Sequence, residues 1–308
     1  MGVGKIESME PTFTDRCEST LLGLALGDAY GRPLEFLSGA MVRSLPVALD
    51  QRFMWTDDTH MALYLAEACL ELEGFDEERF GDAVGRAFGR WLEDPLMPST
   101  APGNTCLAGA RAWMSGRDWR TSGVRRSDGC GAVMRIAPLP MCLSGLALDR
   151  AAHIQAMLTH AHPNAPETAV VGCRLVRALL EGEALSPGLV EGLTPSSGDL
   201  SEGLRAAVRV GTSSCQELPE GDVPTGDGGW RAVSALSLAV AAALRWGEDF
   251  ETAVDRSARI DGDSDSVACL TGMLLGAAGR PLPAAWLQVL PRREAIRDTA
   301  RALSRGLH

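Results

Sequence analysis

The stretch Glu78–Trp91, ERFGDAVGRAFGRW, indicates the fold class of the chain most clearly. Its apolar residues recur at steps of three and four, so they lie on one face of a helix. These residues are Phe80, Val84, Ala87, Phe88 and Trp91. Because strand-like alternation is nearly absent from the rest of the chain, the sequence predicts an all-α fold.

Helical patterns of the same kind cover most of the chain and are separated by Gly- and Pro-rich turns. The segments 183–199 and 212–229 lack any apolar period, and we predict surface loops there. We find no internal repeat and no linker that requires a domain boundary. We therefore expect a single-domain orthogonal helical bundle over 1–308, with an irregular tail at 1–14. The other predicted helices cover 15–30, 59–73, 104–115, 149–159, 167–182, 200–211, 231–246, 265–278 and 291–306.

Two of the predicted helices carry small residues along one face. A glycine in a helix interior costs about 1 kcal/mol relative to alanine, so three on one face need a packing reason. Asp28 interrupts the first stretch, which argues against a pair of membrane helices. We predict that each face meets another backbone closely. The residues are Gly23, Gly27 and Gly31 in the first helix, and Ala268, Gly272 and Gly276 in a late one.

The composition limits the classes of partner and compartment. The chain has 308 residues, is 45% hydrophobic and carries a formal net charge of -11, which disfavours nucleic acid and anionic membranes as partners. Its eight cysteines form no CxxC pair, and Cys69, Cys173 and Cys269 lie in apolar helical stretches, so we expect reduced core thiols. Neither a signal core nor an uncharged apolar run of about 18 residues is present, so we expect a cytoplasmic protein.

Two acidic motifs each stand directly before a predicted helix: WTDDT at 55–59 and DGDSDS at 261–266. Helix capping would explain one carboxylate in each motif. It would not explain several carboxylates packed together, which repel one another unless a cation is present. We therefore favour a metal site, and capping on an exposed surface is the alternative.

Carboxylate and hydroxyl oxygens suit hard cations such as Mg²⁺ or Mn²⁺. A calcium-binding EF-hand does not fit, because its sixth position would be Ser266 and its twelfth Gly272. Two ions about 4 Å apart could instead share a water between them. Glu35 offers a further carboxylate after the first glycine-striped helix, although a single loop glutamate is more often simply solvated.

The order of the separated motifs resembles the ADP-ribosylglycohydrolase family, and the resemblance spans most of the chain. It rests on LGLALGDA at 22–29 followed by Glu35, WTDDT at 55–59, GNT at 103–105, GCGAVMR at 129–135, TH at 159–160 and GDSDS at 262–266.

The resemblance implies an all-α fold with two Mg²⁺ or Mn²⁺ ions in a cleft. Glu35, Asp57 and Asp263 would be the catalytic set, and Glu35 would position water or carry out acid/base work. The implied reaction is hydrolysis at C1″ of ADP-ribose attached to a protein, most often at arginine, with serine, another side chain or a small ADP-ribose conjugate as other acceptors. The alternatives are a noncatalytic ADP-ribose-binding or structural or immunity homologue of the same fold, and a phosphoesterase. The implied metal ligands are Thr56, Asp57, Asp58, Asp263, Asp265 and Ser266.

A second set of residues matches family positions near the substrate. The glycine-rich segment 127–134 suits a pocket lined by backbone N–H groups, although a plain loop is the alternative. Trp230 suits stacking on adenine, and a core tryptophan is equally compatible. Arg135 could bind pyrophosphate or a carboxylate elsewhere. The set comprises Asn104, Thr105, Ser127, Gly129, Cys130, Gly131, Met134, His160 and Trp230.

Two positions depart from the family pattern. Ala101 stands where arginine-specific members often have an aspartate, which leaves the acceptor open. His60 follows the WTDDT motif and is an uncommon choice there. The sequence predicts neither the acceptor nor the oligomeric state, and it does not choose between Mg²⁺ and Mn²⁺.

Overall fold

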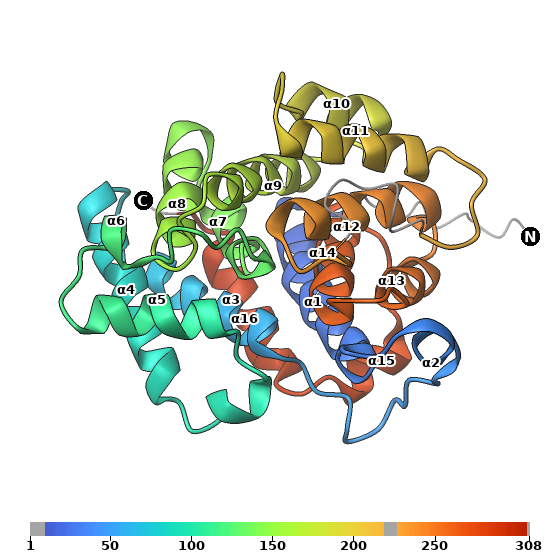
Figure 1. The fold of residues 1–308 in the computed structure, drawn as a ribbon, viewed down its shortest axis with the longest axis horizontal. Helices are drawn as coiled ribbons and strands as arrows, with labels where there is room; N and C mark the ends of the chain where they lie inside the picture. The colour runs from blue at the N-terminus through green and yellow to red at the C-terminus, as the bar shows by residue number, and fades with distance from the viewer. Residues whose placement is uncertain (1–9, 219–226, 307–308) are drawn as a thin grey trace, which may run out of the picture.

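The computed structural model describes residues 10–218 and 227–306, which fold into sixteen α-helices (Figure 1). Within these residues no strand forms, and the only β-type pairings are two isolated bridges, which confirms the all-α prediction. Short 3₁₀ helices cover Arg32–Leu34, Met97–Thr100 and Cys130–Ala132. The α-helices are α1 (Phe13–Gly31), α2 (Gly39–Ser44), α3 (Asp57–Leu70), α4 (Glu77–Glu93), α5 (Asn104–Met114), α6 (Trp119–Ser122), α7 (Pro138–Cys142), α8 (Gly145–Met157), α9 (Asn164–Leu180), α10 (Pro187–Leu193), α11 (Asp199–Gly211), α12 (Ala232–Trp246), α13 (Phe250–Ala258), α14 (Ser264–Ala277), α15 (Ala284–Val289) and α16 (Arg293–Leu303).

Helices α1 and α14 lie against each other at the centre of the molecule (Figure 1). A Cβ at Gly27 would come within 2.0 Å of the carbonyl oxygen of Ala268, and one at Gly23 within 2.3 Å of that of Gly272. No side chain larger than hydrogen fits at these two positions, so the predicted close approach is confirmed. The two glycine stripes pack on each other in antiparallel fashion.

This packing fixes the two ends where the acidic residues lie. Gly31, at the end of α1, faces the start of α14, where a Cβ on Gly31 would lie 2.4 Å from the Cα of Asp265. The segment that leaves α1 carries Glu35. The packing of α1 against α14 therefore brings the end of α1, which leads to Glu35, next to the acidic residues at the start of α14.

Two predicted irregular segments need correction. The segment 183–199 is not all loop, because α10 forms inside it: the side chain of Ser186 caps this helix and Pro187 occupies a first-turn position. The tail predicted at 1–14 is too long, since α1 begins at Phe13, after a capping box between Thr12 and Asp15. The parts of 212–229 that the structure describes contain no helix, and 219–226 lies outside the described residues.

The cysteine prediction is confirmed for the residues on which it rested. All eight cysteines are free thiols, and Cys69, Cys173 and Cys269 are fully buried in the apolar core. Among the described residues, no helix combines the length and the apolar character needed to cross a membrane.

Candidate active site

The first acidic motif is held by Asp28, a fully buried carboxylate on α1. One oxygen of Asp28 accepts the N–H and the hydroxyl of Thr56 at 2.8 and 2.9 Å. The other accepts the N–H and the hydroxyl of Thr59 at 2.9 and 2.5 Å. These four bonds fix the N-terminus of α3, so Asp57 and Asp58 in its first turn have a defined direction.

Sequence reasoning did not assign Asp28 to the site. Asp28 stands inside the motif LGLALGDA at 22–29, but its only signal for a role was that an acidic residue in an otherwise apolar helical stretch is costly to bury without partners.

The second acidic motif is a turn held by its neighbours. The N–H of Asp263 donates to the carbonyl oxygen of Gly228 at 2.8 Å, and Asp261 accepts the N–H of Gly39 at 2.7 Å. Gly228 has a φ of 66°, and a Cβ there would lie 2.3 Å from the carbonyl oxygen of Asp261, so glycine is required for both reasons. The turn therefore rests on the segment that leads to Trp230.

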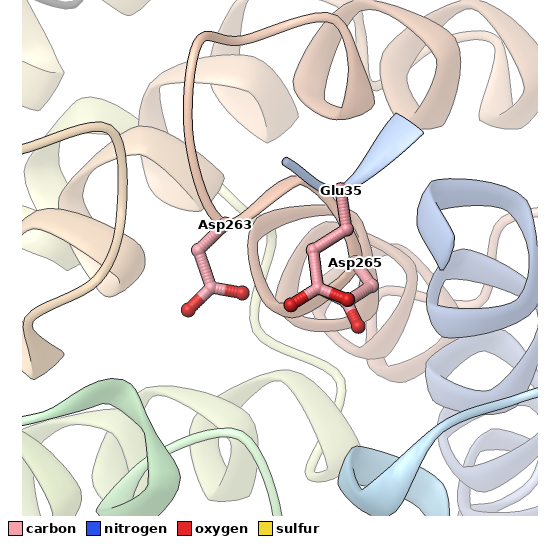
Figure 2. A group of neighbouring side chains, drawn as sticks. All are labelled: Glu35, Asp263 and Asp265. Carbon is pink, nitrogen blue, oxygen red and sulfur yellow. The ribbon is translucent and has the colours of Figure 1, made fainter. Parts of the chain in front are cut away.

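Three carboxylates from these segments form a cluster. One oxygen each from Glu35, Asp263 and Asp265 lie within 4.8 Å of one another. Figure 2 shows the carboxyl groups of Glu35 and Asp265 side by side, with that of Asp263 facing the same space. Glu35 comes from the segment after α1, whereas the two aspartates come from the start of α14.

Asp57 and Asp58 line the same cleft, which has a volume of about 340 Å³. Asp57 accepts the N–H of Gly103 at 3.0 Å. Oδ1 of Asp58 is buried and has no hydrogen-bond partner among the residues that the structure describes. Two acidic turns far apart in the sequence thus line one cleft, as the sequence predicts.

Burial and mutual repulsion strongly disfavour the ionised forms of these groups. Burial, together with the charges of Asp265 and Asp57, raises the pKa of Glu35 to about 9. Burial also raises the pKa of Asp57 to about 8. The pKa values of Asp58 and Asp263 rise well above the ordinary range for the same causes, burial first and the charge of Asp265 second.

The donor set fits a hard divalent cation. It consists of carboxylate oxygens, one of them buried without a partner, and a cation would relieve the repulsion that raises these pKa values. Serine and threonine hydroxyls lie nearby. Ser266 lines the cleft, whereas Thr56 is buried behind it and its hydroxyl bonds Asp28.

The structure brings most of the predicted substrate-binding residues to the same cleft. Ser127 is not among the residues that line it, but its hydroxyl lies 3.2 Å from that of Thr105, which does. The members that line the cleft are Asn104, Thr105, Gly129, Cys130, Gly131, Met134, His160 and Trp230.

The glycine-rich segment is anchored just before its start and in its middle. Val124 donates its N–H to the carbonyl oxygen of Thr159 at 2.9 Å, and Cys130 donates its N–H to that of Trp230 at 3.0 Å. A Cβ on Gly131 would lie 2.8 Å from Cε1 of His160, so the backbone passes close to this ring. The segment is one wall of the cleft rather than a free surface loop.

Arg135 orients His160 from below the cleft. Its guanidinium is fully buried and donates to Gln155 and to the hydroxyl of Thr159, so it is not a pyrophosphate ligand. Because Thr159 accepts this bond, its own hydrogen can go to Nδ1 of His160, 2.8 Å away. Burial, and then the charge of Arg135, lowers the pKa of His160 to about 3, so the ring is neutral near pH 7.

Cys130 is tied to the acidic cluster. Its thiol donates to Oδ2 of Asp263 at 2.7 Å, and burial followed by the charge of Asp263 raises the thiol pKa well above its usual value. Cys130 is therefore a protonated donor, which is not the thiolate that soft metals require.

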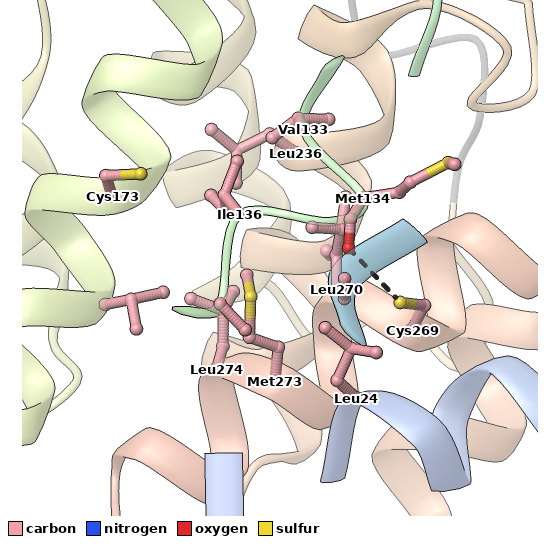
Figure 3. Close-up of a cluster of buried hydrophobic side chains, with 14 of the residues drawn as sticks. Leu24, Val133, Met134, Ile136, Cys173, Leu236, Cys269, Leu270, Met273 and Leu274 are labelled. Carbon is pink, nitrogen blue, oxygen red and sulfur yellow. Dashed lines mark hydrogen bonds between the residues drawn. The ribbon is translucent and has the colours of Figure 1, made fainter. Parts of the chain in front are cut away.

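Met134 connects the cleft to the apolar core. Its carbonyl oxygen accepts a weak hydrogen bond from the thiol of Cys269 at 3.6 Å, and Figure 3 shows this pair above Leu24, Leu270 and Met273. The floor of the cleft is thus supported by the same α1 and α14 packing that positions the carboxylates.

Phe36 also lines the cleft, and no sequence motif predicted it. It has a φ of 63°, its side chain is 73% exposed, and its ring stacks on that of Trp230 with centroids 5.5 Å apart. Trp230 is itself 40% exposed, so it is not a core tryptophan.

The two positions that depart from the family pattern have different surroundings. Ala101 lines the cleft and has a φ of 53°. His60 is buried away from the cleft, where its Nε2 lies 3.1 Å from Asp94, which also accepts the hydroxyl of Tyr64 at 2.8 Å. His60 thus belongs to the packing of α3 against the end of α4.

Comparison with known proteins identifies the family. Residues 9–308 match the family model for ADP-ribosylglycohydrolase. The chain is 28% identical to the ADP-ribosylarginine hydrolase Tri1 of Serratia proteamaculans, over 96% of this chain and 80% of that protein. It is 28% identical to the ADP-ribosyl-[dinitrogen reductase] glycohydrolase of Rhodospirillum rubrum, over 57% and 61% respectively.

A solved structure agrees with these sequence relationships. The structure titled "ADP-ribosylglycohydrolase-related protein complex" superimposes with a TM-score of 0.73 and 28% identity, covering 96% of this chain and 99% of that one. The match of nearly the whole chain to one family model, with the same fold, leads to a single conclusion: this protein belongs to the ADP-ribosylglycohydrolase family.

Proposed function

We propose that this protein hydrolyses the bond between C1″ of ADP-ribose and an acceptor side chain, with arginine on a protein as the favoured acceptor. The observation that carries the proposal is the convergence of five carboxylates from three segments on one cleft. Two relatives whose names specify ADP-ribosylarginine or ADP-ribosyl-dinitrogen reductase as substrate support the choice of reaction.

Two Mg²⁺ or Mn²⁺ ions would be held by the predicted ligands. Bound there, they would supply charge neutralisation and orientation of the ribose hydroxyls. Asp58, with its unpartnered buried oxygen, and Asp265, which lies against the end of α1, are the central ligands of this proposal. The remaining ligands are Thr56, Asp57, Asp263 and Ser266.

The chain's own residues supply the rest of the chemistry. Water attacks C1″, the bond from C1″ to the acceptor nitrogen breaks, and that nitrogen keeps the electron pair and takes up a proton. Glu35 is placed to hold the water. Its carboxyl, whose pKa is about 9 without cations, gives its proton to the leaving nitrogen and then takes one from the attacking water. Carboxylates also stabilise the positive charge that develops on the ribose ring.

The residues of the cleft outside the acidic cluster would bind the rest of ADP-ribose. The backbone N–H groups of Gly129 and Gly131 are suited to phosphate oxygens, because the glycines allow close approach, whereas that of Cys130 is used by Trp230. His160 would donate from Nε2, since its Nδ1 is occupied by Thr159. Asn104 and Thr105, at the N-terminus of α5, would bind a ribose or phosphate oxygen.

The proposal is tested by product analysis. The protein is freed of metal with EDTA, supplied with Mg²⁺ or Mn²⁺, and incubated with proteins ADP-ribosylated on arginine or on serine. We expect free ADP-ribose to be released from the arginine-linked substrate only when metal is added, and Asp58→Asn to abolish release. AMP as the product would indicate a phosphoesterase, and tight ADP-ribose binding without any release would indicate a noncatalytic relative.

A further inference from the structure

Phe36 combines two costly features that no core packing explains. A φ of 63° is unfavourable for a bulky residue by about 1–2 kcal/mol, and the ring is 73% exposed. Strain of this kind persists where the surroundings hold it, and it concentrates at sites that bind ligands. The ring is therefore a candidate contact for something outside the protein.

The stacked pair Phe36 and Trp230 lies at the acidic end of the cleft. Phe36 directly follows Glu35, whose carboxylate belongs to the cluster with Asp263 and Asp265. On the other side, Gly229, the residue before Trp230, packs on the acidic turn, where its Cβ would lie 3.6 Å from that of Asp263. Both rings line the cleft and remain partly open to solvent.

Chemistry decides which part of the substrate reaches this end. The reaction that we propose takes place at C1″, so C1″ lies at the carboxylate cluster. The acceptor is bonded directly to C1″, whereas the adenine ring is separated from it by two riboses and two phosphates. A pair of rings beside the cluster is therefore nearer to the acceptor than to the adenine.

We infer that Phe36 and Trp230 form a platform that selects a planar cationic acceptor, the guanidinium of arginine. A guanidinium stacks on aromatic faces and is weakly hydrated, so it gains more from such a platform than an ammonium or a hydroxyl does. This inference rests on the proposed function and adds the residues that select arginine as the acceptor.

The cleft has no carboxylate at Ala101 that could pair with a guanidinium. The remaining carboxylates lie in or beside the proposed metal cluster, so their charge is largely committed. Ring stacking is the other common way in which proteins bind guanidinium groups.

The test uses the full chain with Mn²⁺ and two peptides that differ only in carrying ADP-ribose on arginine or on serine. We expect Phe36→Ala and Trp230→Ala each to raise KM for the arginine conjugate about 3- to 30-fold, the range of one cation–π contact. The Kd for free ADP-ribose and any turnover of the serine conjugate should change less than twofold. Trp230→Phe should restore most of the loss, and Leu146→Ala, which removes a 69% exposed apolar side chain on α8, is the matched control.

A second measurement is independent of turnover. The binding of ethylguanidine and of ethylamine, two cations of equal charge, is compared on protein saturated with ADP-ribose. Wild type should bind ethylguanidine more tightly, and the preference should vanish in Phe36→Ala and Trp230→Ala. An equal loss of affinity for free ADP-ribose would instead place adenine on Trp230 and overturn the inference, as would an unchanged preference in both variants. Absence of hydrolysis with the preference intact would contradict only the proposed function.

Discussion

Gly31 at the end of α1 lies directly against Asp265 at the start of α14, where a Cβ on the glycine would come within 2.4 Å of the aspartate's Cα. This relationship links the core to the chemistry, because the helix pair that builds the centre of the fold also sets the position of an acidic residue. A substitution in the contact between α1 and α14 should therefore affect both the stability of the protein and the geometry of the site.

We predict that Gly27→Ala destabilises the protein by more than about 3 kcal/mol or prevents folding, because its Cβ would lie 2.0 Å from the carbonyl oxygen of Ala268 and neither backbone can yield cheaply. Chemical denaturation measures the effect. The matched control is Gly192→Ala in α10, where, in the described part of the chain, no atom outside the helix's own backbone lies within 4 Å of the new Cβ. It should be neutral or stabilising by up to about 1 kcal/mol. Equal stability of the two variants would contradict the close packing of α1 on α14.

The bonds that Asp28 accepts make a second prediction. Thr59→Val keeps the shape of the side chain but removes the hydroxyl that donates to this buried carboxylate at 2.5 Å. The expected loss is about 1.5–3 kcal/mol of unfolding free energy, typical of a hydrogen bond to a charged group. Thr59→Ser keeps the hydroxyl and should lose less than about 1 kcal/mol. Similar losses in the two variants would show that the hydroxyl does not matter.

The acidic cluster predicts how the stability of metal-free protein depends on pH. The pKa of Asp57 is raised from 3.8 to about 8 and that of Glu35 from 4.5 to about 9. Between about pH 4 and pH 8 the folded state therefore holds more protons than the unfolded state, so the unfolding free energy falls as the pH rises. In EDTA we expect Tm to fall from pH 5 to pH 8, and the fall to be smaller in Glu35→Gln.

Adding metal should oppose this loss of stability at high pH. Cations favour the ionised carboxylates, so the increase in Tm produced by millimolar Mg²⁺ or Mn²⁺ should be larger at pH 8 than at pH 5. Thermal unfolding at the two pH values measures the difference. An increase that is the same at both pH values, or a Tm in EDTA that rises with pH, would contradict the cluster as described.

Much of the fold was predictable because most helices carry their own pattern of apolar residues in the local sequence. The ten long helical patterns correspond to observed helices whose ends differ by a few residues, and the stripe of Gly23, Gly27 and Gly31 identified a close backbone contact. Short helices such as α10 were missed, since a helix that buries only Val190 has no apolar period to detect. The apolar pattern of the local sequence therefore predicts helices that bury one whole face, and it misses short helices that do not.

The acidic residues of the site were predictable from the sequence, whereas the residues that position them and the aromatic pair beside them were not. WTDDT and DGDSDS are continuous motifs, so both could be assigned before their convergence was known. Asp28 acts through bonds to residues 28 and 31 positions away, and the stacking of Phe36 on Trp230 joins segments nearly 200 residues apart. Contacts of this kind depend on tertiary packing, which one sequence does not display.

The account depends most on cation binding by the two acidic turns together. Electron paramagnetic resonance should count the Mn²⁺ bound by wild type, by Asp58→Asn in α3 and by Asp265→Asn in α14, with Asp149→Asn on α8 as a control. We predict two bound ions in wild type and in the control, and fewer than two in each of the other variants. Saturable Mn²⁺ binding that is identical in all four proteins, or no binding in wild type, would contradict the account.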